Sequence, residues 1–209
     1  MIRFIYGFNL FRESEVAKSM FRHRADQFRT RLNWDVHVDR DGFERDYYDT
    51  LNPMYVIVTS ERGDHLGSMR FLPTIGRTML NDHFSGLYRG QAIQSPATWE
   101  CTRFCLAPGA GPRTAVKLLA AGASLMKEFN LHHLIAVFDH KMARVYRRSQ
   151  VSPTILASGL YRGAMVSIGQ WNYSRERHAE LLLSAGIGAA EMELYLANSD
   201  VMDDVKKYA

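Results

Sequence analysis

Residues 97–107, ATWECTRFCLA, constrain the fold of this chain most, because they combine the pattern of a buried β-strand with two opposite charges. Their apolar and β-branched side chains favour a central strand. Glu100 and Arg103 nevertheless lie within this run. An unpaired ionised group in an apolar environment is very costly, so both charges require partners from other parts of the chain.

The spacing of the two charges predicts an irregular strand. Glu100 and Arg103 are three residues apart, so regular alternation would place them on opposite faces of a sheet. A β-bulge within residues 101–103 would bring both side chains to one side. We expect this bulge to separate the strand from its neighbour and to open a cleft.

The remaining sequence predicts an α/β or α+β sandwich with a mixed sheet, because strand and helix signals alternate in its second half. No repeat or linker interrupts residues 1–209, a length that suits a single domain. The expected strands are residues 1–7, 54–60, 65–73, 96–107, 132–138, 162–170 and 190–196. The expected helices are residues 13–33, 113–130, 141–149 and 174–186.

Composition excludes several classes of protein. The net charge is only +4 and the basic residues form no long run, so we expect no nucleic-acid partner. No apolar run approaches the roughly 18 residues of a membrane span, so we expect no membrane partner. Cys101 and Cys105 lack a second ligand pair for zinc, so we expect thiols, no metal and a cytoplasmic location.

Several further charges occur in apolar surroundings. Arg24 shares a helical face with Met20 and Phe28, although a long arginine can also extend from the edge of such a face into water. Arg70 could likewise lie on the solvent face of its strand. Taken together, these charges sum to zero, and we expect a neutral buried network that orients a polar ligand. Its expected members are Arg24, Arg70, Arg103, Asp46, Asp49 and Glu100.

These residues resemble the motifs of the acyl-homoserine-lactone synthases, the bacterial autoinducer synthases of quorum sensing. The resemblance covers residues 20–106 and rests on Arg24, Phe28, Trp34, the run ERDYYD, Arg70, Phe84 and the run WECTRF. It implies a three-layer α/β sandwich similar to the N-acetyltransferase fold, with a mixed central sheet whose splayed strands form a V-shaped cleft. It also implies acylation of S-adenosylmethionine by a thioester on acyl carrier protein or coenzyme A. Lactonisation then releases methylthioadenosine, and S-adenosylmethionine is a substrate, so no cofactor is expected.

The resemblance and the chemistry of the side chains suggest roles for individual residues. Glu100 is the candidate general base for the methionyl amine, and Arg103 the candidate partner of a carboxylate. Asp46 and Asp49 complete the expected catalytic group. S-adenosylmethionine is expected to contact Arg24, Phe28, Trp34, Arg70, Arg103 and Phe104. The acyl and pantetheine chain is expected to contact Phe84, Leu118, Met126, Val137, Met142 and Tyr146.

Other features bear on the acyl donor. The glycine-rich run PGAGP precedes a predicted helix, where a phosphate can bind. Five basic residues could form a surface for an acidic carrier protein or could simply be solvated, namely Lys117, Lys127, Arg144, Arg147 and Arg148. Phe138 and Asp139 occupy the place where family members with a 3-oxo preference often have threonine, which leaves the acyl group open.

Two other interpretations remain. The chain could be an N-acetyltransferase that uses acetyl-coenzyme A, with the glycine-rich run at the pyrophosphate. It could also be a non-catalytic module that binds a nucleoside or a carrier protein. The first alternative does not explain Arg24, Trp34 and the carboxylates of the run DYYD. The second gives less reason to place Glu100 and Arg103 together in one strand.

Overall fold

The structure is a computed structural model that describes residues 1–200, and the chain divides into two compact units. Unit 1 contains residues 1–70, 103–124 and the segment from residue 176 onward. Unit 2 contains residues 71–102 and 125–175. Two strands and two helices each contain residues of both units. The single domain expected for residues 1–209 stays a prediction.

Seven strands are hydrogen-bonded in the order β1-β2-β3-β4-β5-β7-β6. The contact between β4 and β5 is parallel, whereas β1–β2, β5–β7 and β6–β7 are antiparallel, so the mixed sheet is confirmed. The strands are β1 (Ile2–Tyr6), β2 (Met54–Thr59), β3 (His65–Pro73), β4 (Thr98–Leu106), β5 (His133–Asp139), β6 (Thr154–Tyr161) and β7 (Ala164–Asn172). The helices are α1 (Ser14–Ala25), α2 (Pro112–Glu128), α3 (His140–Arg148), α4 (Arg175–Ala185) and α5 (Ala189–Ala197).

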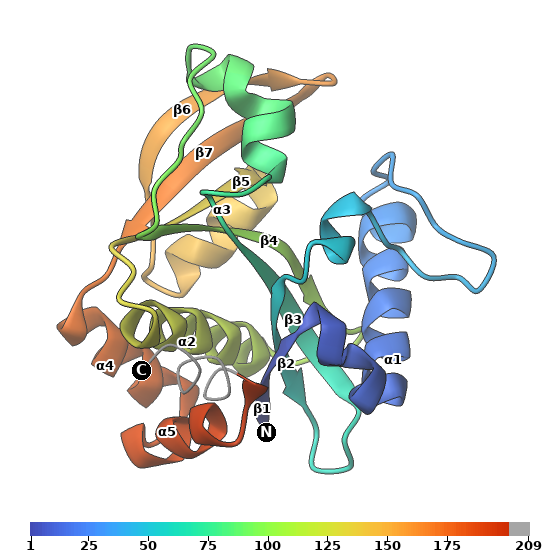
Figure 1. Ribbon diagram of the computed structural model, residues 1–209, viewed down its shortest axis with the longest axis vertical. Helices are drawn as coiled ribbons and strands as arrows, with labels where there is room; N and C mark the ends of the chain where they lie inside the picture. Colours follow the sequence, from blue (N-terminus) through green and yellow to red (C-terminus); the bar gives the residue numbers. More distant parts are fainter. Residues whose placement is uncertain (201–209) are drawn as a thin grey trace. The chain divides into compact units, whose positions relative to one another are not determined.

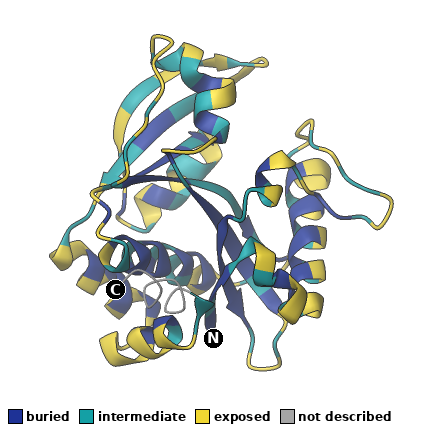
Figure 2. Cartoon of the chain, viewed as in Figure 1, coloured by how far each residue is buried: buried dark blue, intermediate teal, exposed yellow. Residues whose placement is uncertain are grey.

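Unit 1 is built in three layers. Figure 1 shows α1 on one side of strands β1 to β3 and helices α2, α4 and α5 on the other side. Apolar residues at helical spacing in α1, including Met20 and Phe21, pack against Ile5, Tyr55 and Ile57 of the first two strands. Every residue of β2 is buried, because both faces of this strand are covered by helices. Figure 2 shows the buried strand and the exposed outer sides of the helices.

Helix α1 continues into a π-helix, Asp26–Arg31, so that the helix expected from the sequence is confirmed over most of its length. Buried positions recur at Met20, Arg24 and Phe28, which lie four residues apart along one face. The polar Arg24 is therefore carried on the same buried stripe as its apolar neighbours.

Unit 2 contains β5, β6 and β7 together with α3. Asp139 ends β5 and begins α3, because its carboxylate accepts hydrogen bonds from the backbone N–H groups of Lys141 and Met142, each 2.9 Å long. Leu80, Ile135 and Ile168 form a fully buried apolar cluster in this unit.

Two sequence predictions at secondary-structure level need correction. The strand expected at residues 190–196 is wrong, because this segment forms helix α5. Met192 and Leu196 are buried four residues apart, whereas Leu194 is exposed, which is the spacing of a helix rather than of a strand. Strand β6 was not predicted, because its serine, glycine and alanine residues give a weak strand signal.

Candidate active site

Three arginines and three carboxylates of unit 1 form one buried ionic network. Arg24 donates from Nε to Glu44 Oε2 at 2.6 Å and from both terminal nitrogens to the two oxygens of Asp49, each at 2.9 Å. Arg24 and Glu44 are 1% and 0% exposed, so neither group is solvated. The interpretation of Arg24 as an arginine that extends into water is therefore wrong.

Arg70 and Arg103 complete this network. Arg70 donates to Asp46 Oδ2 at 3.0 Å and to Asp49 Oδ1 at 2.8 Å, and it is fully buried, so the alternative of a solvent-facing strand position is wrong. Arg103 Nη2 donates to Glu44 Oε1 at 2.9 Å and to Asp46 Oδ2 at 2.6 Å. Each carboxylate bridges two arginines, which is an arrangement of strong charge-assisted bonds.

The network confirms the expected neutral sum of charges but corrects one of its members. Glu44, rather than Glu100, is the carboxylate that joins Arg24 to Arg103. Glu44 was not predicted as a site residue, although it lies two residues before Asp46. Its place as the first residue of the run ERDYYD was the available signal.

A tight turn presents the two aspartates. Asp46 begins the short 3₁₀-helix Tyr47–Thr50, and its side chain accepts from the backbone N–H of Asp49. The carboxylate of Asp49 accepts in return from the backbone N–H of Asp46 at 2.8 Å, so the pair forms a reciprocal capping box. This reciprocal capping fixes both carboxylates toward the arginines.

Neighbouring positive charges keep Asp49 ionised. Burial alone would raise the pKa of Asp49, but the charges of Arg24 and Arg70 outweigh burial and hold this pKa well below its ordinary value. Tyr55 donates its hydroxyl to Asp49 Oδ1 at 2.5 Å, and burial together with the charge of Asp49 raises the pKa of Tyr55 well above its ordinary value. Tyr55 is therefore a permanent hydrogen-bond donor to the network.

An aromatic pair borders the network. Phe28 and Trp34 stack with ring centroids 5.1 Å apart and planes inclined by 14°. The guanidinium carbon of Arg103 lies 5.4 Å from the centroid of the Phe28 ring. Trp34 remains 40% exposed, so this stack offers a face to solvent beside a set of fixed charges.

Strand β4 is irregular where the sequence predicted a bulge. Arg103 has a φ of +54°, a left-handed conformation that is uncommon for a residue with a side chain. The ladder of β4 with β5 pairs Thr98 to Glu100 with His133 to Ile135, within the described residues. Because a left-handed residue costs about 1–2 kcal/mol, the ion pairs of Arg103 must help to maintain this conformation.

Glu100 belongs to unit 2 and is 1% exposed. Its Oε2 accepts from the backbone N–H of Met79 at 2.9 Å, and its Oε1 accepts from that of Leu80 at 2.6 Å. Two N–H groups at the start of the short π-helix Leu80–Phe84 therefore hold both carboxylate oxygens. These two backbone donors orient the carboxylate of Glu100.

The residues expected to contact the acyl chain occupy buried and half-buried positions. Phe84 is buried and its ring centroid lies 4.4 Å from that of Tyr161 in unit 2. Met126 and Tyr146 are buried, whereas Val137 and Met142 are half-buried. Leu118 is fully buried in the part of α2 that belongs to unit 1, and Phe104 is half-buried in β4. Their contact with an acyl chain stays a prediction.

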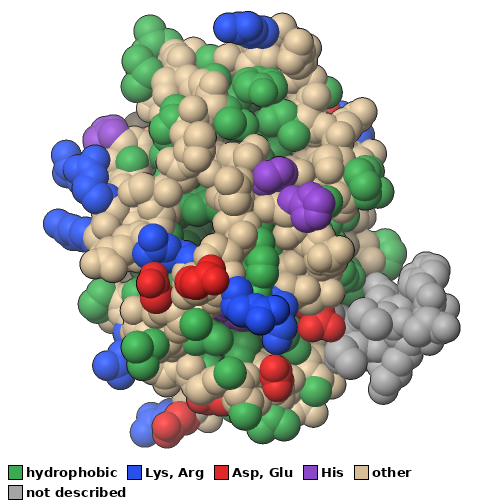
Figure 3. All heavy atoms as spheres, turned by 90° about the vertical axis from the view of Figure 1, so that its left-hand side faces the viewer, with side chains coloured by type: hydrophobic (Ala, Val, Ile, Leu, Met, Phe, Trp, Pro, Cys, Tyr) green, Lys and Arg blue, Asp and Glu red, His purple; other side chains and the backbone are tan. Residues whose placement is uncertain are grey.

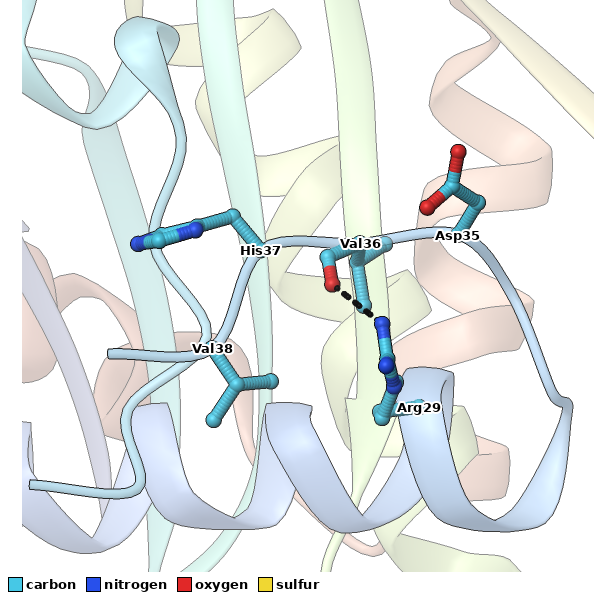
Figure 4. Close-up of a pocket in the computed structure, with 5 residues that line it drawn as sticks. All are labelled: Arg29, Asp35, Val36, His37 and Val38. Carbon is cyan, nitrogen blue, oxygen red and sulfur yellow. Dashed lines mark hydrogen bonds between the residues drawn. The ribbon is translucent and has the colours of Figure 1, made fainter. Parts of the chain in front are cut away.

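A surface pocket of about 440 Å³ lies in unit 1, in the segment that follows Trp34. Figure 4 shows Arg29 donating from Nη1 to the backbone carbonyl of Val36, at 3.1 Å. The residues that line this pocket were not predicted as site residues from the sequence. They are Arg29, Asp35, Val36, His37 and Val38.

Residues 1–200 contain neither a cluster of metal-ligating side chains nor a helix that could cross a membrane. Three or more metal-ligating side chains gather nowhere in this part of the chain. In the same part of the chain, no helix has both the length and the apolar character that a membrane crossing requires.

Residues 7–181 match the protein family described as autoinducer synthase. The chain belongs to this family. A curated acyl-homoserine-lactone synthase of Rhizobium etli is 37% identical over 183 residues, which cover 84% of this chain and 86% of the relative. Another, from Ralstonia nicotianae, is 34% identical over 158 residues, covering 71% and 76%.

Solved structures of synthases from the same family share the fold. The coenzyme-A-dependent acyl-homoserine lactone synthase BjaI, solved with S-adenosylmethionine and isopentyl-CoA, aligns with a TM-score of 0.80 at 21% identity, over 90% of each chain. LasI aligns with a TM-score of 0.75 at 23% identity, over 87% of this chain and 93% of LasI. An N-acetyltransferase-like protein from Lactobacillus plantarum aligns with a TM-score of 0.58 at 14% identity, over 83% and 99%. The expected fold class is confirmed.

Proposed function

We propose that this chain synthesises N-acyl-homoserine lactones from S-adenosylmethionine and an acyl thioester, for use in quorum sensing. The amine of S-adenosylmethionine attacks the thioester carbonyl and expels the thiol. The methionyl carboxylate then attacks its own γ-carbon, which closes the lactone and releases methylthioadenosine. Membership of the autoinducer synthase family supports this proposal, and the buried ionic network beside a stacked aromatic pair is the structural observation that carries it.

The exposures within the network identify which members would contact the substrate. Arg103 is 9% exposed at its side chain, compared with 1% for Arg24 and 0% for Arg70. Asp46 is 20% exposed, compared with 7% for Asp49. Arg103 and Asp46 therefore form the accessible side of the network, while the other members hold them in place.

This accessible side matches the charges of S-adenosylmethionine. The guanidinium of Arg103 suits the methionyl carboxylate, and the carboxylate of Asp46 suits the ammonium or the sulfonium. The face of the Phe28–Trp34 stack suits the sulfonium and the adenine ring. We assign Arg24 and Arg70 a positioning role, because both are fully enclosed by carboxylates.

Glu100 is the proposed general base. Its two carboxylate oxygens accept from the backbone N–H groups of Met79 and Leu80, which aims the carboxylate in one direction. Burial and the two backbone bonds fix its orientation, which general-base catalysis requires. This role is expected to contribute roughly a hundredfold or more to turnover.

The acyl donor is proposed to be acyl carrier protein or coenzyme A. Lys127, Arg144, Arg147 and Arg148 are exposed on unit 2 and could meet an acidic carrier. The face shown in Figure 3 has positive and negative side chains interspersed, rather than one large patch of a single sign. The donor is therefore left to experiment, as is the cytoplasmic location expected from the sequence.

A product assay tests the proposal. The purified chain is incubated with S-adenosylmethionine and a panel of acyl-CoA and acyl-carrier-protein thioesters, and the products are identified by mass spectrometry. We expect equal amounts of acyl-homoserine lactone and methylthioadenosine. An acetylated amine without methylthioadenosine would indicate an N-acetyltransferase. Absence of turnover over the whole panel would indicate a binding protein and refute the proposal.

A further inference from the structure

Asn81 links the short π-helix Leu80–Phe84 to a distant loop of unit 2. Its Nδ2 donates to the backbone carbonyl of Ile93, and its Oδ1 accepts from the backbone N–H of Ile93, both at 2.9 Å. A side-chain amide carries a donor NH₂ group and an acceptor oxygen, and here both are used on a single residue twelve positions away. The link therefore has a fixed orientation as well as a fixed distance.

Ile93 is itself held on two sides. It belongs to the irregular segment 89–97, which leads directly into β4. Its side chain packs against the buried apolar cluster that includes Leu80. Two residues later, the N–H of Ser95 donates to the hydroxyl of Thr74 at 3.0 Å. Ile93 is therefore a fixed point to which the amide of Asn81 can attach.

The linked helix carries the N–H groups that hold Glu100. The N–H of Met79 donates to Glu100 Oε2 at 2.9 Å and that of Leu80 donates to Oε1 at 2.6 Å. Asn81 directly follows these two donors in the chain. A helix of five residues is too short to be stable on its own, so its position depends on tertiary contacts such as the Asn81–Ile93 pair. A shift of this helix would therefore be transmitted to the carboxylate of Glu100.

We propose that Asn81 is a positioning residue for Glu100, the proposed general base. Its amide holds the N–H groups of Met79 and Leu80 in the place where they direct the carboxylate toward the amine. Asn81 itself takes no part in the proton transfer. The proposal rests on the proposed function, because it concerns the base of that reaction.

The expected effect is on turnover rather than on substrate binding. A displacement of about 1 Å at a catalytic group can lower a rate about a hundredfold. Asn81→Ala removes both bonds to Ile93 and leaves the donors of Glu100 less well fixed, so kcat should fall about tenfold or more. The ionic network proposed to bind S-adenosylmethionine belongs to unit 1, whereas Asn81 and Ile93 belong to unit 2. KM for S-adenosylmethionine should therefore change by less than about twofold.

A double-mutant cycle separates positioning from a purely structural role. Lactone formation is measured for wild type, Asn81→Ala, Glu100→Gln and the double variant, at a temperature where urea unfolding shows each of them to be folded. If Asn81 acts through Glu100, Asn81→Ala should lower kcat in the wild-type background and change it by less than about twofold in the Glu100→Gln background. A purely structural role would lower kcat by the same factor in both backgrounds and would overturn the proposal.

Asn172→Ala is the matched control. Asn172 also belongs to unit 2, and its Oδ1 lies 2.9 Å from Nδ1 of His133 and 3.0 Å from Nε2 of Gln170. These exposed contacts involve neither Glu100 nor its two N–H donors, so kcat should stay within about twofold of the wild-type value. A loss of kcat as large as that of Asn81→Ala would contradict a specific role for Asn81.

A second variant keeps the test valid if the alanine variant does not fold. Asn81→Gln keeps the amide on a side chain one carbon longer, so it should retain more turnover than Asn81→Ala. The cycle with Glu100→Gln is repeated with Asn81→Gln, and the same loss of effect in the Glu100→Gln background is expected. Equal losses of kcat by Asn81→Gln in both backgrounds would overturn the proposal.

The same measurements separate failure of this proposal from failure of the proposed function. Unchanged kcat in Asn81→Ala, while wild type forms lactone, would overturn the role of Asn81 and leave the proposed function intact. Absence of lactone from wild type over the whole panel of thioesters would refute the proposed function and with it the role of Asn81.

Discussion

Arg24 and Asp49 are joined by two parallel N–H···O hydrogen bonds, each 2.9 Å long, in the interior of unit 1. This geometry uses the planar fork of a guanidinium, which the point charge of a lysine cannot reproduce. Glu44 occupies the third donor, Nε, at 2.6 Å. Each of the three guanidinium nitrogens of Arg24 therefore donates to a carboxylate oxygen.

Arg24→Ala is predicted to be strongly destabilising. It leaves Asp49 and Glu44 without a buried partner, and breaking a buried ion pair in this way costs about 3–5 kcal/mol. The free energy of unfolding of Arg24→Lys should lie between those of Arg24→Ala and wild type, because lysine restores the charge without the planar fork of the guanidinium. The free energy of unfolding in urea measures the effect. Arg177→Ala serves as control, because its pair with Glu180 is exposed and should contribute at most about 1 kcal/mol.

Two substitutions at Arg103 separate the effect of its backbone conformation on stability from the effect of its side-chain ion pairs. Both Arg103→Gly and Arg103→Ala remove the bonds to Glu44 and Asp46, but only glycine relieves the left-handed φ of +54°. Arg103→Gly should therefore be more stable than Arg103→Ala by about 1 kcal/mol. Urea unfolding of the two variants checks this order. Greater stability of the alanine variant would contradict the assigned conformation of β4.

Glu100→Gln is predicted to reduce kcat by roughly a hundredfold or more, because an amide cannot act as the base. The substitution also turns an NH₂ group toward the N–H of Met79 or Leu80, which should cost about 1–3 kcal/mol of stability. Turnover is therefore measured below the unfolding transition of the variant. Nearly unchanged turnover would remove Glu100 from the mechanism.

Because His65 is buried, we expect the folded protein to lose stability in mild acid. Its Nδ1 lies 2.8 Å from Nδ1 of His23, and its Nε2 is buried without a partner among the described residues. Burial, aided by His23 and Arg24, lowers the pKa of His65 to about 3, and burial also lowers that of His23, although Asp26 opposes this change. The unfolded chain therefore binds the proton first as the pH falls. The contribution of His65 to the free energy of unfolding is fully present above about pH 6.5. It should decrease by about 1.4 kcal/mol per pH unit as the pH falls toward 3.

Urea unfolding at about pH 7 and about pH 5 tests this dependence. His65→Gln should remove the contribution of His65 to the pH dependence. The difference in the free energy of unfolding between the two pH values should therefore shrink by about 2 kcal/mol. An unchanged difference in the variant would assign the acid sensitivity to other groups.

A side chain added at Gly169 would collide with neighbouring residues of unit 2. A Cβ at this position would lie 2.6 Å from Cε1 of Phe138 and 2.7 Å from Cγ of Pro153. Gly169→Ala should therefore force the Phe138 ring to move and cost about 1–3 kcal/mol. Gly86→Ala is the matched control, because nothing lies within 4 Å of its added Cβ. Similar unfolding midpoints for the two variants would contradict the close packing of β5 against β7.

Local sequence patterns were sufficient for most elements of the fold. The apolar stripe that includes Met20 and Phe28 predicted helix α1, and the run MYVIVTS predicted strand β2. Residues 190–196 show the limit of such patterns. Alternating apolar residues there predicted a strand, but Tyr195 bonds to Glu191 one helical turn earlier, and Leu194 is left in solvent.

The sequence by itself determined that Arg24, Arg70 and Arg103 need carboxylate partners, because unpaired buried charges are too costly. It also predicted the irregularity of β4 near Arg103. Only the tertiary structure decided that Glu44 is the third carboxylate, since it brings together residues 59 positions apart in the chain. Local sequence carries no information on which of several acidic residues reaches an arginine, because that choice depends on how distant strands and turns pack.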